Sequence, residues 1–181
     1  MANQFPFLLC RFDSHLGFLG GGEDHFTQMA GGLVDLWRDN APAHGENGTY
    51  SCDLYGTEVV KVIKAHPPSD PLFVYLPLHD THSPYECTPK WMDSRVKQPL
   101  RQLMQCMLTC TDDITGQVVE QLRSKQMWDN TLMVWSADSK LMTIRCLVEY
   151  SVQLSARLVP QLTIAAFHVC CRWWPTVLGS Q

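Results

Sequence analysis

An α/β fold with a parallel sheet is predicted for this chain, because two short apolar runs flank one long amphipathic segment. The runs cover residues 72–76 and 131–135, and the segment between them covers about 96–125. Strand, helix and strand in this order form a βαβ unit, in which a right-handed crossover joins two parallel strands. The 181 residues, 45% hydrophobic and 18% charged, suffice for one compact domain.

The N-terminal third of the chain divides into an irregular part and a helix. Glycines are frequent in the first 50 residues and consecutive at 20–22, so an irregular, surface-forming segment is expected there. Valine and isoleucine then recur at helical spacing over residues 59–63. Thr57 is a suitable N-cap, and the helix is expected to end at His66, before two prolines.

The first predicted strand leads into a polar segment. Residues 72–76 are mostly apolar and lie between Pro71 and Pro77, which suits a strand covered on both faces. Histidines and other polar residues follow at 79–84. Because α/β proteins place their sites at the carboxyl ends of strands, this segment is a candidate site.

The strongest helix signal comes next. Apolar residues form one stripe along residues 96–125, as in a helix with one buried face. A turn is predicted at residues 128–130 and a second buried strand at 131–135, followed by polar residues at 136–140. The two polar segments are expected to leave the same edge of the parallel sheet.

Charge and hydropathy exclude several classes of partner. Fourteen basic and eighteen acidic residues give a net charge of −4 without a block of like charges, which argues against nucleic acid or an anionic membrane. Residues 141–181 are more apolar, but Pro160 interrupts their uncharged stretch and no membrane span is predicted. The apolar residues 5–10 lack a preceding basic region, so no signal peptide is predicted.

The cysteines give little evidence for a metal site. None of the eight cysteines forms a C-x-x-C pair, which argues against a zinc ribbon. Cys106 and Cys110 lie one helical turn apart and could bind a metal, but ordinary buried thiols are the favoured interpretation. Residues 47–49 form an N-glycosylation triplet, which has a meaning only in a secreted protein.

The two polar segments offer groups for metal or acid–base chemistry. His79, Asp80 and His82 include suitable metal ligands, but a further convergent ligand is missing, and surface side chains at a strand end are the simpler interpretation. Asp138 could bind a hard cation such as Ca²⁺, although it is a single acid. No G-x-S-x-G or P-loop sequence occurs, which excludes serine hydrolases of that type and P-loop NTPases.

Four segments stand out together along the chain, at residues 12–20, 75–84, 107–116 (MLTCTDDITG) and 127–138 (MWDNTLMVWSAD). In this order and spacing they resemble the sulfatases, in the arylsulfatase B-type branch. The resemblance covers about residues 11–139. It implies a partial catalytic domain at 1–140 and an apolar tail, 141–181, that resembles no known family.

The resemblance implies an alkaline-phosphatase-like α/β sandwich and the hydrolysis of sulfate esters. Family members use a formylglycine, made within a C-x-P-S-R-type motif, and a Ca²⁺ ion that polarises the sulfate. His82, with Pro84 in place, corresponds to the catalytic histidine that holds the sulfate and protonates the leaving oxygen. Asp138 corresponds to the first residue of the metal-binding D-N-G motif. Lys140 stands where this motif has glycine, so weak Ca²⁺ binding is expected.

The departures from the family pattern leave three functional readings open. No C-x-P-S-R sequence occurs in the 181 residues, so an inactive, truncated sulfatase is expected first. A working sulfuric ester hydrolase completed by another chain is the second reading. The third is a non-catalytic protein that binds sulfate or sulfated glycans.

Members of this branch enter the secretory pathway, to lysosomes or the extracellular space. A partial sheet would also expose a strand edge and an apolar face, which the tail could partly cover.

Overall fold

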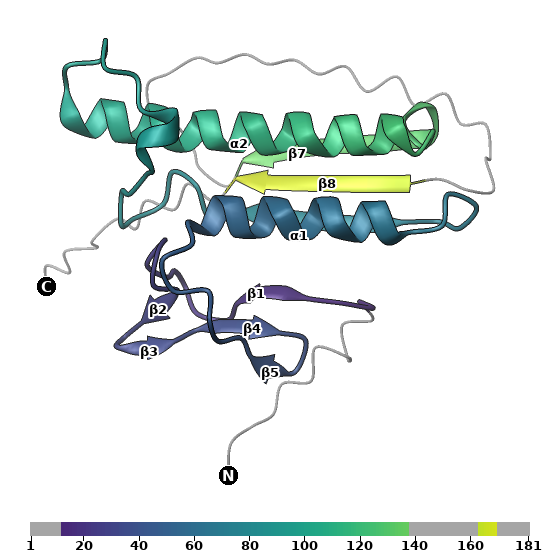
Figure 1. The fold of residues 1–181 in the computed structure, drawn as a ribbon, viewed down its shortest axis with the longest axis horizontal. Coiled ribbons are helices and arrows are strands. Elements are labelled where there is room, and N and C mark those ends of the chain that lie inside the picture. Colours follow the sequence, from purple (N-terminus) through teal and green to yellow (C-terminus); the bar gives the residue numbers. More distant parts are fainter. Residues whose placement is uncertain (1–11, 138–162, 170–181) are drawn as a thin grey trace, which may run out of the picture.

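A layer of two helices lies on one face of a three-stranded parallel sheet (Figure 1). The computed structural model describes residues 12–137 and 163–169. Its parallel sheet has the order β6-β8-β7, with β6 at Phe73–Leu78, β8 at Thr163–Val169 and β7 at Thr131–Ala137. Helices α1 (Ser51–Ala65) and α2 (Pro99–Ser124) pack side by side on the same face. The predicted α/β class is confirmed.

Residues 12–50 are more regular than predicted. They form a small antiparallel sheet of β1 (Leu16–Phe18), β4 (Leu36–Arg38) and β5 (Ala41–Pro42), and a hairpin of β2 (Met29–Ala30) and β3 (Leu33–Val34).

Polar side chains within the segment order its loops. Asp35 accepts the Gly20 N–H at 2.6 Å, and Asp24 Oδ1 accepts the N–H groups of Phe26 and Thr27. These short carboxylate side chains satisfy loop N–H groups that no strand pairs. The expectation of an irregular segment was therefore only partly correct.

Helix α1 begins at Ser51, earlier than predicted, and Gly56 lies inside the helix rather than before it. Tyr50, not Thr57, occupies the N-cap position, with extended backbone angles. A Cβ atom on Gly56 would lie 1.8 Å from Ile114 Cδ1 of α2, so this glycine lets the two helices approach closely. The predicted end at His66 is confirmed, since His66 is the C-cap residue.

Strand β6 is longer than predicted and is covered on one face only. It includes Pro77, which a strand at the edge of a sheet tolerates. Leu76 and Leu78 are buried, whereas Phe73 and Tyr75 are 55% and 50% exposed. The expectation of a strand covered on both faces was wrong, and the exposed apolar face expected of a partial sheet is present.

Strand β8 comes from the region that the sequence interprets as an apolar tail. Its backbone pairs in parallel with β6 and β7 and thus lies within the sheet rather than over it. Leu78 and Ala137 both pair with Val169, so the outer strands end at the same level, roughly 10 Å apart by the usual strand spacing. The carboxyl ends of β6 and β7 therefore lie at the same edge of the sheet, with one strand between them, while residues 138–140 of the second predicted polar segment lie outside the described residues.

The remaining helical elements agree well with the sequence pattern. Helix α2 lies within the predicted range 96–125, and the predicted turn at 128–130 is the short 3₁₀ helix η3 (Trp128–Asn130). A second 3₁₀ helix, η2 (Pro89–Trp91), precedes α2. Among the residues that the structure describes, no helix is long and apolar enough to cross a membrane.

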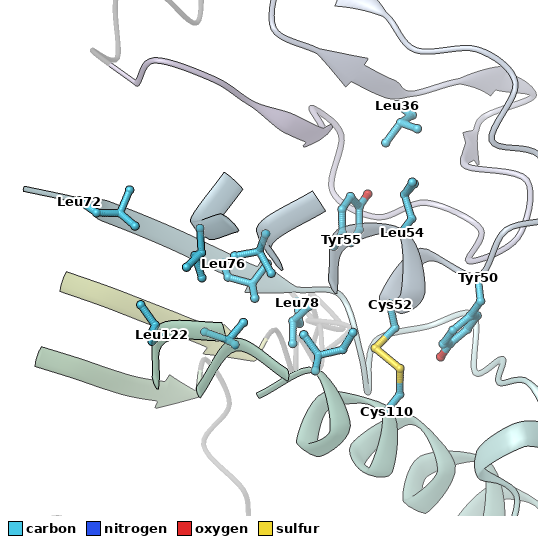
Figure 2. Close-up of a cluster of buried hydrophobic side chains, with 14 of the residues drawn as sticks. Leu36, Tyr50, Cys52, Leu54, Tyr55, Leu72, Leu76, Leu78, Cys110 and Leu122 are labelled. Atoms are coloured by element: carbon cyan, nitrogen blue, oxygen red, sulfur yellow. A yellow bond between two sulfur atoms is a disulfide. The ribbon is translucent and has the colours of Figure 1, made fainter. Parts of the chain in front are cut away.

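Two disulfides fix α2 to other parts of the fold. Cys52–Cys110 joins α1 to α2 inside the hydrophobic core, where Leu78 and Tyr55 are also buried (Figure 2). Cys87–Cys106 joins the segment after β6 to α2. The interpretation of Cys106 and Cys110 as free buried thiols was wrong, because their partners come from segments that only the tertiary fold brings close.

Candidate functional site

Three histidine rings pack together at the carboxyl end of β6. His79 and His82 come from the segment after β6, and His25 comes from the loop between β1 and β2. The His79 ring is stacked on His25, with ring centroids 4.4 Å apart, and lies 5.1 Å from His82. We call these three residues the imidazole cluster.

The N-terminal strands and loops form one wall of the imidazole cluster. A Cβ atom on Gly22 would lie 3.1 Å from His82 Cε1, so only glycine lets the backbone pass this close without displacing the ring. The Phe18 ring of β1 lies 5.0 Å from His79, measured between centroids. The consecutive glycines of the irregular segment thus have a packing role.

Hydrogen bonds fix the orientation of the His82 ring. Its Nδ1 atom lies 2.6 Å from the Ser83 carbonyl oxygen and 3.3 Å from His79 Nε2. A carbonyl oxygen only accepts hydrogen bonds, so we assign the hydrogen to His82 Nδ1. His82 Nε2 is then the ring atom that can exchange a proton with a ligand.

The two inner rings of the imidazole cluster are held neutral. Burial lowers the pKa of His79 to about 3, with further contributions from the nearby His25 and His82. Burial also lowers the pKa of His25, whose Nδ1 lies 2.8 Å from Ser51 Oγ. His25 Nε2 and His79 Nδ1 are buried without a hydrogen-bond partner. A bound anion would favour protonation of these rings.

Two buried acids lie beside the imidazole cluster in sequence. Asp80 is 1% exposed, accepts a hydrogen bond from the Tyr50 hydroxyl at 3.1 Å, and has a pKa raised to about 7 by burial. Glu23 accepts a hydrogen bond from the Tyr55 hydroxyl, and burial raises its pKa to about 7 as well. The interpretation of His79 and Asp80 as surface groups was wrong, since both are buried.

Asp80→Asn is expected to remove part of the pH dependence of stability. With a folded-state pKa of about 7, against 3.8 ordinarily, Asp80 keeps its proton in the folded state between pH 4 and 7, while the unfolded chain loses it. The free energy of unfolding of the wild type therefore falls as pH rises through this window. Asparagine cannot ionise, so the variant should gain on the order of 4 kcal/mol relative to the wild type between pH 4 and pH 8.

Urea denaturation at pH 4 and pH 8 checks this prediction. Asp129→Asn, which removes an exposed acid, is the control for the loss of one charge. An equal stability difference between Asp80→Asn and the wild type at both pH values would contradict the assigned burial effect.

The described residues do not fit the predicted Ca²⁺ ion. The one group of three potential ligands found in residues 12–137 and 163–169 is Cys52, Asp80 and Cys110, whose ligand atoms lie within 4.8 Å of one another. The two sulfurs are bonded to each other, and Ca²⁺ takes oxygen ligands. Asp138, the predicted metal ligand, lies outside the described residues together with Lys140.

Comparison with known proteins decides the family. A family model described as Sulfatase matches residues 11–143, which is most of the chain. This chain belongs to the sulfatase family. It is 28% identical over 136 residues to arylsulfatase J of Mus musculus, and the match covers 71% of this chain and 23% of the relative. The sulfatase chain thus spans about a quarter of the length of that relative.

Solved structures support the sulfatase fold. The crystal structure of Ps i-CgsB matches with a TM-score of 0.59 and 23% sequence identity, covering 72% of this chain and 33% of the other. The structure of Ps i-CgsB in complex with k-i-k-neocarrahexaose matches over the same shares with a TM-score of 0.62. The predicted partial sulfatase sandwich is confirmed at the level of the fold.

Sequence reasoning found only part of the imidazole cluster. The resemblance to the sulfatase motif indicates His82, and the position after a predicted strand indicates His79. His25 was missed, because it lies in a glycine-rich loop, far from β6 in sequence. Glu23 and Tyr50 were missed as well, since only the tertiary fold shows that both are buried and that the Tyr50 hydroxyl donates to Asp80, two residues after β6.

Proposed function

We propose that the imidazole cluster of this sulfatase chain binds the sulfate group of a sulfated glycan through His82 Nε2. The fixed His82 ring carries the proposal, because its Nδ1 atom is engaged by the Ser83 carbonyl. The match to an arylsulfatase and the neighbour bound to an oligosaccharide support the ligand class.

The chemistry of His82 suits an ester of sulfuric acid. A protonated His82 donates from Nε2 to a sulfate oxygen, in a charge-assisted hydrogen bond that is stronger than a neutral one. The hydrogen bond from Nδ1 to the Ser83 carbonyl holds the ring in place. In a sulfuric ester hydrolase the same atom would give its proton to the leaving oxygen.

We propose binding without turnover for these 181 residues. None of the eight cysteines begins a C-x-P-S-R sequence, so this sequence carries no precursor for the formylglycine nucleophile of a sulfatase. Sulfuric ester hydrolysis of the arylsulfatase type is then a proposal for a longer or completed sulfatase, to which this chain would contribute the sulfate-binding histidine.

His82→Ala is expected to weaken the binding of a sulfated oligosaccharide at least 10-fold. One charge-assisted hydrogen bond contributes about 1.5–3 kcal/mol, and 1.4 kcal/mol is a factor of ten in affinity. Isothermal titration calorimetry with a sulfated oligosaccharide and its desulfated form measures the effect.

The matched control for this experiment is His44→Ala, which removes an exposed histidine outside the imidazole cluster. Its affinity should equal that of the wild type. Unchanged affinity of His82→Ala, or equal binding of the desulfated form, would refute the proposed role of His82.

A further inference from the structure

We propose that Asn47 is the acceptor of an N-linked glycan. Asn47, Gly48 and Thr49 form the N-x-T acceptor triplet, and no other asparagine of the chain is followed at the second position by serine or threonine. The proposal concerns a surface turn and does not depend on ligand binding by the imidazole cluster.

The structure presents the triplet on an exposed turn. Asn47, Gly48 and Thr49 are all exposed, between β5 and α1. The Thr49 N–H donates to the Glu46 carbonyl at 2.9 Å, which closes a four-residue turn with Asn47 as its second residue. Gly48, the third residue, has a φ of +95°, which glycine adopts without strain.

The backbone of this turn is anchored while the Asn47 side chain is free. The Gly48 N–H donates to the Phe26 carbonyl at 2.7 Å, which fixes the turn to the loop before β2. No hydrogen bond of the Asn47 side chain is found within residues 12–137 and 163–169. The amide is therefore accessible to a transferase without unfolding of the neighbouring strands.

The two disulfides provide an independent observation. Disulfides persist in oxidising compartments, such as the lumen of the endoplasmic reticulum, and are rare in the cytosol. Cys52–Cys110 is buried in the core and Cys87–Cys106 fixes the segment after β6, so both belong to the folded structure. A fold that forms in this lumen is exposed to the enzymes that glycosylate asparagine.

The transfer requires a lipid-linked oligosaccharide pyrophosphate as the second substrate. The Asn47 Nδ2 atom forms a bond to the anomeric carbon of the first sugar, and the bond from this carbon to the pyrophosphate oxygen breaks. The lipid pyrophosphate leaves with the electron pair, and the amide nitrogen loses one proton. No group is oxidised or reduced.

Secretion of the full chain from eukaryotic cells behind a cleavable leader tests the proposal. The intact mass should exceed that of the polypeptide by one glycan. Release by an amidase in ¹⁸O water should leave a single labelled residue, Asp in place of Asn47, in the peptide map. Asn47→Gln and Thr49→Ala should both lose the added mass completely, whereas Thr49→Ser, which keeps an acceptor triplet, should retain it.

Secreted wild-type protein that has both disulfides and an unmodified Asn47 would overturn the proposal. Because this result is read on the wild type, poor folding of a variant does not affect it. Loss of the added mass in Thr49→Ser together with its loss in Thr49→Ala would also count against recognition of the triplet.

Discussion

Replacing Cys52 and Cys110 together by alanine is expected to lower the free energy of unfolding by about 4 kcal/mol. The disulfide joins residues 58 positions apart, and cross-linking a loop of this length restricts the unfolded chain by about that free energy. It also connects α1 to α2 in the core, next to the buried Asp80. Among the substitutions expected to destabilise the chain, this pair has the largest effect.

The second disulfide provides the matched comparison. Cys87 and Cys106 are 19 positions apart, so their replacement by alanine should cost about 3 kcal/mol, less than the first pair. Urea denaturation of the two double variants and the wild type measures both values. Unchanged stability of the Cys52→Ala, Cys110→Ala variant would contradict the assigned pairing.

Gly56→Val is expected to destabilise the chain by about 3 kcal/mol, because it places a side chain between the two helices. A Cβ atom at this position would lie 1.8 Å from Ile114 Cδ1 and 3.0 Å from Ile114 Cγ1. The isoleucine cannot avoid both contacts by moving only its terminal methyl group. The loss should appear as a lower midpoint of urea denaturation.

Two further variants show whether helix packing causes the Gly56 effect. Gly116→Ala lies on α2 where an added Cβ meets nothing within 4 Å, so it should stabilise the chain by up to about 1 kcal/mol. Ile114→Ala should restore part of the stability of Gly56→Val, because neighbouring substitutions are coupled. If Gly56→Val and Gly116→Ala behaved alike, close packing of α1 on α2 would be refuted.

The sequence predicted the elements whose signals are local. The apolar stripe of α2 spans seven turns and fixes the helix regardless of its neighbours, so its bounds were close. The start of α1 was misplaced, because Thr57 looks like a cap and Gly56 like a boundary unless the contact with Ile114 is known. β8 was missed because its place between β6 and β7 depends on pairing with distant residues.

The candidate site was predictable only in part for the same reason. His82 lies in a short motif with a family pattern, which sequence reading can detect. The stacking of His25 on His79 and both disulfides join segments from different parts of the chain. Spacing along the sequence gives no information on such contacts, since loops of many lengths can bring the same groups together.

Nuclear magnetic resonance of the histidine side-chain nitrogens tests the proposed function most directly. The histidine ¹⁵N signals of the 181-residue chain would be followed during titration with a sulfated oligosaccharide, while free sulfate is measured in the same sample. We predict that His82 Nε2 shifts on binding, that the desulfated form causes no shift, and that no sulfate is released. An unshifted His82 signal at saturating ligand, or steady release of sulfate, would contradict binding without turnover at the imidazole cluster.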